Sequence, residues 1–302
     1  MMKMRNGNMK TGLIDVDGHN FPNLPLMKIS AYHKAHGDEV EWWNGLKHYD
    51  RVYMSKVFNG SPDVETVIQA DEVIRGGTGY NLDSRLPPGI ENVHPDYGLY
   101  GIRDTAYGFL TRGCPRDCGF CIVTEKEGRR SEKVADLTDF WNGQKTITLL
   151  DPNLLAYGER YGPLGQLADS DAYVDFTQGL DIRLVDDGVI NLLNGIRTKM
   201  LHFAWDDPDD VETAEKLGLF AEKSRIQDFR KRRVYVLTNF NSTHEQDLYR
   251  VYRLREMKYD PYVMIYAKES APRRTRHLQR WVNNKRVFRV CERFGDYDPK
   301  MG

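Results

Sequence analysis

Short apolar runs alternate with a helical pattern in the first 80 residues of the chain. Leu26, Ile29 and His33 recur at the spacing of one helix face, and Gly37 follows as a helix stop. Four apolar runs of strand length surround this pattern, at residues 11–16, 39–42, 51–57 and 72–74. Because strands that alternate with helices form parallel sheets, we predict a small Rossmann-like α/β domain over residues 1–80.

Proline positions predict one more helix and a linker in this half of the chain. Ser61 followed by Pro62 is typical of an N-cap and a first helical residue, so we expect a helix that begins there and carries Val64. Residues 81–98 contain three prolines and no periodic pattern. We therefore predict a linker over residues 81–99.

The alternation of strands and helices restarts near residue 105 and continues almost to the end. Six strand candidates lie at residues 106–110, 145–150, 173–177, 200–204, 234–237 and 262–265. Polar residues cluster just after each of these strands. The pattern predicts a β/α barrel, open or closed, over residues 100–270, with its site at the carboxyl ends of the strands. Residues 271–302 remain as a basic C-terminal extension.

Two of the helices between these strands have recognisable start signals. Asp207, followed by Pro208 and two further aspartates, predicts a helix that Asp207 caps. Ser242 and Glu245 have the spacing of a capping box at the start of a later helix.

Composition and charge exclude several classes of protein. The chain has 302 residues, a formal net charge of −1 and a hydrophobic share of 40%, which is too apolar for a disordered chain. No apolar run approaches the ~18 residues of a membrane span, and the first residues lead into no signal peptide, so we expect a cytoplasmic protein without a membrane partner. The near-neutral charge is unevenly distributed, because residues 222–302 hold 20 Lys and Arg against 10 Asp and Glu.

Three of the four cysteines lie within eight residues, in the sequence TRGCPRDCGFC. Cys114, Cys118 and Cys121 follow the first barrel strand, and closely spaced thiolates on a short loop can bind three irons of a cubic iron–sulfur cluster. The fourth iron would then be open to a small molecule. A structural zinc site is the alternative, but it normally has four ligands, and no second pair with the usual spacing follows. Cys291 stands alone, in a stretch where a buried structural residue is the default interpretation.

This loop resembles the signature of the radical S-adenosylmethionine (SAM) superfamily, which has the same cysteine spacing and an aromatic residue, here Phe120, before the last cysteine. The resemblance implies a partial (β/α)6 barrel, a 4Fe–4S cluster on the three cysteines, and SAM on the open iron. It also implies reductive cleavage of SAM to a 5'-deoxyadenosyl radical, with electrons from a flavodoxin- or ferredoxin-type donor. Phe120 is then expected near the adenine.

Further SAM-binding residues are expected at the strand ends. Where the superfamily commonly has Gly-Gly-Glu after the second strand, this chain has Asp151-Pro152-Asn153. Asp151 still offers a carboxylate to the ammonium group of SAM. The other candidates follow the third, fourth and fifth strands: Gln178, Asp181, Arg183, Asp206 and Asn239. The resemblance leaves the catalytic residues unknown.

The N-terminal domain resembles the cobalamin-binding domain of one branch of the superfamily. Asp17-Gly18-His19 matches the beginning of a motif whose histidine ligates cobalt, whereas Pro22 replaces a glycine of that motif. The domain is also short, which favours a degenerate domain without cobalamin. A cobalamin-dependent methyltransferase with His19 as cobalt ligand remains an alternative.

The substrate does not follow from the motif. Cys291 is the only further cysteine, so a second cluster held by cysteines of this chain is excluded. Residues 273–289 combine seven Arg and Lys with Trp281 and Phe288, a composition that suits either phosphate contact with base stacking or an amphipathic helix that closes the barrel. A nucleic-acid substrate, or a non-catalytic nucleic-acid-binding protein with a structural metal site, therefore stays open.

Overall fold

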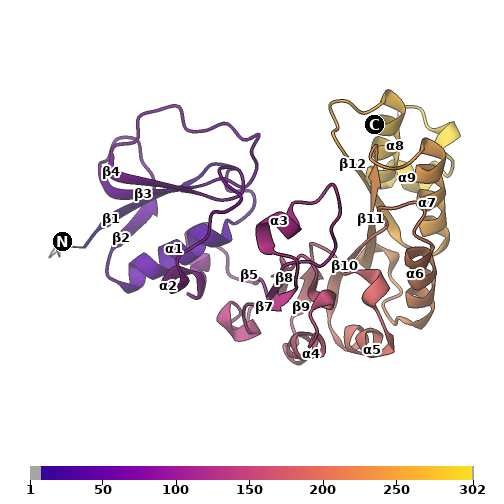
Figure 1. Cartoon of the computed structure of the whole chain (residues 1–302), viewed down its shortest axis with the longest axis horizontal. Helices are drawn as coiled ribbons and strands as arrows, with labels where there is room; N and C mark the ends of the chain where they lie inside the picture. Colours follow the sequence, from indigo (N-terminus) through magenta and orange to yellow (C-terminus); the bar gives the residue numbers. More distant parts are fainter. Residues whose placement is uncertain (1–7, 301–302) are drawn as a thin grey trace. The chain divides into compact units, whose positions relative to one another are not determined.

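The computed structural model describes residues 8–300, which divide into two compact units (Figure 1). The first unit runs up to Tyr107 and includes Thr138–Gln144; the second comprises Gly108–Leu137 and the chain from Lys145 onward. Within residues 8–300, no helix combines the length and the apolar character needed to cross a membrane.

A four-stranded parallel sheet forms the first unit. Its strands are β1 (Lys10–Asp15), β2 (Glu39–Trp42), β3 (Tyr49–Ser55) and β4 (Ala70–Gly76), in the order β2-β1-β3-β4. All four strands were predicted from their apolar runs.

One long helix, α1 (Leu24–Ala35), packs on this sheet. Asn23 caps it by accepting a hydrogen bond from the backbone N–H of Leu26, and the helix ends just before Gly37, whose φ is +83°. The apolar side of α1 packs in a cluster with Leu13 and Tyr53 of the sheet. Two short helical segments follow, α2 (Pro88–Glu91) and the 3-10 turn η1 (Tyr97–Tyr100).

The predicted helix at Ser61 is absent, and this prediction was wrong. The Ser61 hydroxyl donates a 2.6 Å hydrogen bond to the carboxylate of Asp17, which also accepts from the backbone N–H groups of Val57 and Phe58. The hydroxyl is therefore unavailable as an N-cap, and the connection from β3 to β4 stays irregular. Val64 and Ile68 pack against a buried cluster of the sheet from this loop.

A six-stranded sheet is the framework of the second unit, and the predicted partial barrel is found. Its linear order is β12-β11-β10-β9-β8-β5, and the register of β8 to β12 is parallel throughout. Five strands belong to the second unit: β8 (Thr146–Leu149), β9 (Tyr173–Phe176), β10 (Thr198–Ala204), β11 (Arg232–Thr238) and β12 (Asp260–Ile265). The sixth, β5 (Thr105–Gly108), spans the boundary at which the first unit ends in the sequence. A linear order means that the sheet is open, as in a partial barrel.

Helices connect these strands, and several line up along one side of β10 to β12 in Figure 1. The connecting helices include α4 (Tyr161–Asp169), α5 (Asp187–Gly195), α6 (Val211–Lys223) and α7 (His244–Glu256), and α8 (Arg273–Asn283) and α9 (Lys285–Val290) follow the last strand. Short 3-10 turns lie at Leu137–Asp139, Leu154–Ala156, Ile182–Leu184, Phe229–Lys231 and Phe294–Asp296.

Two predicted caps are displaced along the chain. Asp210, and not Asp207, caps α6, because its carboxylate accepts from the backbone N–H of Thr213. The capping box of α7 consists of Thr243 and Gln246 in place of Ser242 and Glu245. Pro208 consequently lies before helix α6 and outside its first turn.

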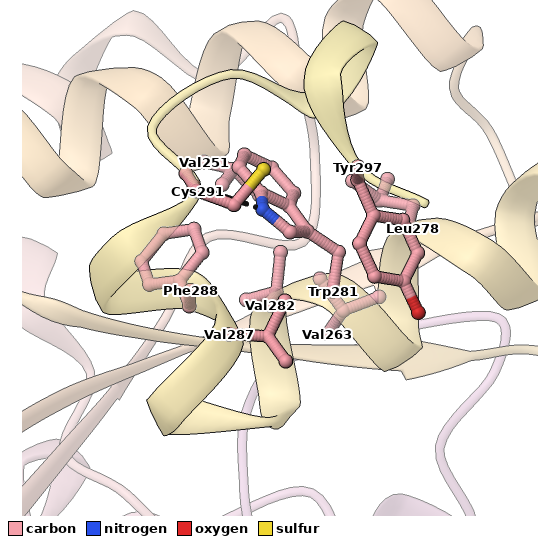
Figure 2. Close-up of a cluster of buried hydrophobic side chains, with 9 residues drawn as sticks. All are labelled: Val251, Val263, Leu278, Trp281, Val282, Val287, Phe288, Cys291 and Tyr297. Carbon is pink, nitrogen blue, oxygen red and sulfur yellow. Dashed lines mark hydrogen bonds between the residues drawn. The ribbon is translucent and has the colours of Figure 1, made fainter. Parts of the chain in front are cut away.

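The C-terminal extension closes over the edge of the sheet. Helices α8 and α9 place Trp281, Phe288 and Cys291 in a buried apolar cluster with Val263 of β12, and the Trp281 indole N–H donates a 3.0 Å hydrogen bond to the backbone carbonyl of Cys291 (Figure 2). Because Trp281 and Phe288 are buried, they are not available to stack on nucleic-acid bases. Cys291 is the buried structural residue that was expected.

The side-chain amide of Asn283 completes the free edge of β12. Its Oδ1 accepts from the backbone N–H of Val263, and its Nδ2 donates to the Val263 carbonyl, both at 2.9 Å. The amide thus pairs with both backbone groups of one edge residue as a neighbouring strand would.

Candidate functional site

The cysteine loop has a fixed backbone. It begins after β6 (Thr111–Arg112) and leads into α3 (Val123–Glu127), and the chain then returns as β7 (Glu132–Lys133), which pairs antiparallel with β6. Gly113 has φ +88°, and a Cβ at this position would lie 1.8 Å from the backbone carbonyl oxygen of Arg130. The backbone N–H of Cys114 donates to Gly128, and that of Cys121 to Cys118. Only glycine fits at position 113.

The three thiols on this loop differ in their exposure to solvent. Cys114 and Cys118 are half-buried, whereas Cys121 is exposed. Burial raises the pKa of the Cys118 thiol, and the negative charges of Cys121 and Asp206 add to this effect. Within residues 8–300, no three His, Cys, Asp or Glu side chains converge as ligands of a single metal ion.

Asp151 is buried beneath the loop. Its carboxylate accepts from the backbone N–H groups of Leu110 and Thr111 and from the Thr111 hydroxyl at 2.8 Å. Burial raises the pKa of Asp151 to about 6. The Asp151 carboxylate therefore joins the chain just after β8 to the segment that leads into the cysteine loop. Its expected role in binding the ammonium group of SAM stays a prediction.

Asn153 contacts the first cysteine directly. Its side-chain Nδ2 lies 3.5 Å from Sγ of Cys114, and its Oδ1 is buried without a hydrogen-bond partner among the described residues. The Asn153 backbone carbonyl accepts a 3.0 Å hydrogen bond from the Ser131 hydroxyl. Asn153 is thus the one strand-end candidate that touches a cysteine sulfur within the described part of the chain.

Asp181 links the cysteine loop to the strand ends. It accepts 2.8 Å hydrogen bonds from Arg116, which lies between two of the cysteines, and from Arg183, which also contacts Asp210 at 3.1 Å. Burial by itself would raise the pKa of Asp181, but the two guanidinium groups outweigh it and the pKa is lowered. The structure therefore brings Asp181 and Arg183 together with the cysteine loop.

Asp206 is half-buried just after β10 ends, near Cys118 and Arg183. Burial raises its pKa to about 6, although the positive charge of Arg250 acts in the opposite direction. A carboxyl group in this position can accept hydrogen bonds from hydroxyl groups of a ligand beside the cysteine loop.

The sequence did not single out Arg250, which organises this end of the sheet. Its guanidinium is completely buried and donates to the backbone carbonyls of Asp206 and Leu237, and to the carboxylate of Asp247. The sequence contains a pattern that indicates this ion pair, because Asp247 and Arg250 are spaced i, i+3 on a predicted helix between apolar residues.

An aromatic group adjoins the cysteine loop from the fifth and sixth strands. Phe120 packs edge-to-face on Phe240, and Phe240 packs on Tyr266. Asn239 has φ +61°, and its Nδ2 donates to the Tyr266 carbonyl at 2.8 Å. Asn239 therefore shapes the loop that presents Phe240, whereas Gln178 is exposed after β9.

His19 lies in the first unit and is exposed. Its ring lies tilted against Trp42, with ring centroids 4.2 Å apart, and packs edge-to-face with Tyr100 at 5.7 Å. Asp17 is occupied by the β3–β4 loop, as described above. The role of His19 as a cobalt ligand stays a prediction.

Comparison with known proteins finds partial sequence relatives, whereas no family model matches the chain. It is 32% identical over 96 residues to the tRNA-2-methylthio-N(6)-dimethylallyladenosine synthase of Bordetella petrii, a match that covers 29% of this chain and 17% of that protein. The protein of the same name from Sulfurihydrogenibium sp. is 26% identical over 137 residues, which cover 43% of this chain and 28% of that protein. The matches thus span less than a third of the length of these relatives.

Two solved structures are distantly similar. The Streptococcus suis SuiB structure bound to S-adenosylmethionine has 12% identity and a TM-score of 0.43, over 63% of this chain and 48% of that chain. The radical S-adenosylmethionine methyltransferase TsrM from Kitasatospora setae has 13% identity and a TM-score of 0.42, over 85% of this chain and 67% of that chain.

Proposed function

Because the chain belongs to the radical SAM superfamily, we propose that it is an enzyme that holds a 4Fe–4S cluster on Cys114, Cys118 and Cys121 and binds SAM beside it. The observation that carries this proposal is the loop itself. A backbone that only Gly113 permits places three thiols at the carboxyl ends of parallel strands, where barrel enzymes have their sites.

The chain's own residues around the loop support a SAM pocket. Asp206 offers a half-buried carboxyl group to ribose hydroxyls, and Arg183, near Cys118, offers a cation to the methionine carboxylate. Phe120 and Phe240 provide an apolar surface for the adenine. Gln178 and Asn239 complete the set of strand-end candidates.

When bound, the cluster supplies the electron that cleaves SAM to methionine and a 5'-deoxyadenosyl radical. The half-buried Cys114 and Cys118 keep their side of the site from water, while the exposed Cys121 lies on the side open to a redox partner. A flavodoxin- or ferredoxin-type protein is the expected donor. A reducing cytoplasm suits free thiols of this kind.

Anaerobic reconstitution tests this function. Wild-type protein should bind close to four irons per chain, show the broad visible absorption of a 4Fe–4S cluster, and release 5'-deoxyadenosine from SAM under dithionite. Cys118→Ala should lose the absorption and the product. Cys291→Ala should retain both, because Cys291 is buried among the apolar side chains of the C-terminal extension. Stoichiometric zinc without iron after anaerobic purification would contradict the proposal.

RNA is the substrate class that two observations favour. The sequence relatives are named as tRNA-modifying synthases. Helices α8 and α9 carry seven Arg and Lys and no acidic residue, and Arg273, Arg276, Arg286 and Arg289 are exposed. Since Trp281 and Phe288 are buried, this surface would contact phosphates and leave the bases unread.

Salt titration of RNA binding tests the substrate class. Fluorescence anisotropy with a labelled tRNA should show a strong decrease in affinity with salt, and Arg273→Glu/Arg276→Glu should reduce both the affinity and the salt slope. The matched control Arg253→Glu, on α7 where the native arginine pairs with Glu256, should change both less. Equal binding of the double variant and wild type would contradict an RNA contact at α8.

A further inference from the structure

We propose that the side-chain amide of Asn153 donates a hydrogen bond to the cluster-ligating sulfur of Cys114 and makes the reduction potential of the cluster less negative. This inference rests on the proposed function, because it needs a cluster on Cys114. It assigns to Asn153 a role in positioning and tuning the cysteine ligand.

The first support is the fixed position of the amide. Asn153 is 4% exposed, and its Nδ2 lies 3.5 Å from Sγ of Cys114, within hydrogen-bonding range for sulfur. Ser131 holds the Asn153 backbone through a 3.0 Å hydrogen bond. The next two residues, Leu154 and Leu155, are buried and start a 3-10 turn. A side chain anchored on both sides has little freedom to turn away from the sulfur.

The second support is the chemistry of the sulfur. A cysteine that ligates iron is a thiolate and has no proton to donate. Only the NH2 side of the amide can therefore face it, which fixes the amide orientation and directs Oδ1 elsewhere. That Oδ1 is buried with no partner in residues 8–300, so it is an acceptor that a donor group of a bound ligand can satisfy.

The third support is the asymmetry among the three cysteines. Within the described residues, no side-chain N–H donates to Cys118 or Cys121, so the Asn153 amide singles out Cys114. A hydrogen bond to a ligand sulfur stabilises the more negative, reduced cluster over the oxidised one. Its loss should therefore move the potential in the negative direction.

A redox titration without SAM tests the proposal. The reconstituted wild type, Asn153→Ala and Asn153→Asp are titrated anaerobically, and the reduced cluster is followed by electron paramagnetic resonance. Both variants lack the NH2 donor, and both midpoint potentials should be more negative than that of the wild type. Asn191→Ala, which removes an exposed asparagine of α5, should leave the potential unchanged.

A second measurement, the affinity for SAM, tests the role of the Asn153 Oδ1 separately from that of Nδ2. Asn153→Asp retains an oxygen acceptor and Asn153→Ala does not, so equilibrium dialysis should show SAM affinity reduced about tenfold in Asn153→Ala and close to wild type in Asn153→Asp. Iron content is measured in each sample. Should Asn153→Ala fail to fold, Asn153→Asp still provides the redox test.

Two different failures can be distinguished. If wild-type protein binds no iron, the proposed function itself is wrong, and this inference with it. If wild type and Asn153→Asp bind equal iron and have the same midpoint potential, the cluster proposal stands and the role of Asn153 is overturned.

Discussion

The guanidinium of Arg250 donates a 2.6 Å hydrogen bond to the backbone carbonyl of Trp205, the residue that directly follows β10. The same group reaches the Leu237 carbonyl near the end of β11. One buried cation therefore binds carbonyl groups at the ends of two adjacent strands. It also donates to the backbone carbonyl of Asp206, the candidate ligand-binding residue.

Replacing Arg250 by methionine should destabilise the second unit strongly. The substitution leaves three carbonyls and the Asp247 carboxylate without their buried donor, which should lower the free energy of unfolding by about 3–5 kcal/mol. Urea denaturation followed by circular dichroism measures this loss. Arg253→Met, three residues along the same helix in an exposed ion pair, should cost less than about 1 kcal/mol, and equal effects would show that burial of Arg250 is unimportant.

Gly113→Ala should abolish cluster binding. A Cβ would clash with the Arg130 carbonyl, and the residue would be held at a positive φ, so the cysteine loop must move. Iron content after anaerobic reconstitution should fall to that of Cys118→Ala. Gly158→Ala, where a Cβ meets no atom within 4 Å, is the control and should load iron normally. An iron content in Gly113→Ala equal to that of the wild type would contradict the conclusion that only glycine fits at this position.

Asp181→Asn should reduce stability in a pH-dependent way. The pKa of Asp181 is lower in the folded protein than its ordinary value of 3.8, because Arg183 and Arg116 outweigh the effect of burial. Its carboxylate therefore stabilises the fold above about pH 4, and this contribution is lost as the pH falls through the lowered pKa.

The expected difference between wild type and Asp181→Asn is about 1–2 kcal/mol at pH 7, since both arginines are partly exposed. It should shrink towards zero in acid. Metal-free protein unfolded by urea at several pH values gives the measurement, and Asp187→Asn, at an exposed aspartate, should show little difference at any pH. A difference that grows in acid would contradict the assigned charge contacts.

Trp281→Ala should loosen the C-terminal extension. The side chain is fully buried in the cluster of Figure 2 and donates to the Cys291 carbonyl, so truncation should cost about 3–5 kcal/mol. Limited proteolysis should then cleave α8 and α9 faster than in wild type. Val290→Ala, at an exposed apolar residue, should leave the cleavage rate unchanged, and resistance of Trp281→Ala to the protease would show that the cluster is dispensable.

The sheet strands could be predicted because each contains a short run of apolar residues. The helix at Ser61 could not be judged in the same way, since a capping hydroxyl and a hydroxyl bound to Asp17, 44 positions earlier in the chain, have the same local sequence. The caps at Asp210 and Thr243 were missed by three residues and one residue for a related reason. Several polar residues precede each helix, and only the folded backbone selects among them.

In the candidate site too, features that depend on neighbouring residues could be predicted, and features that depend on distant segments could not. Cysteine spacing alone located the loop, because the ligands are close in sequence. The hydrogen bond between Thr111 and Asp151 was not expected from the sequence, and Arg250 was not singled out. Both depend on contacts between segments 13 to 45 residues apart, which a local pattern does not contain.

Asn283 has a consequence for how the protein behaves in concentrated solution. An exposed edge strand is a template on which another chain can add a strand, and such addition leads to aggregation. The side-chain amide that occupies both backbone groups of Val263 removes one such pairing position on β12. Asn283 therefore disfavours self-association of the open sheet through this edge, which a closed barrel does not have.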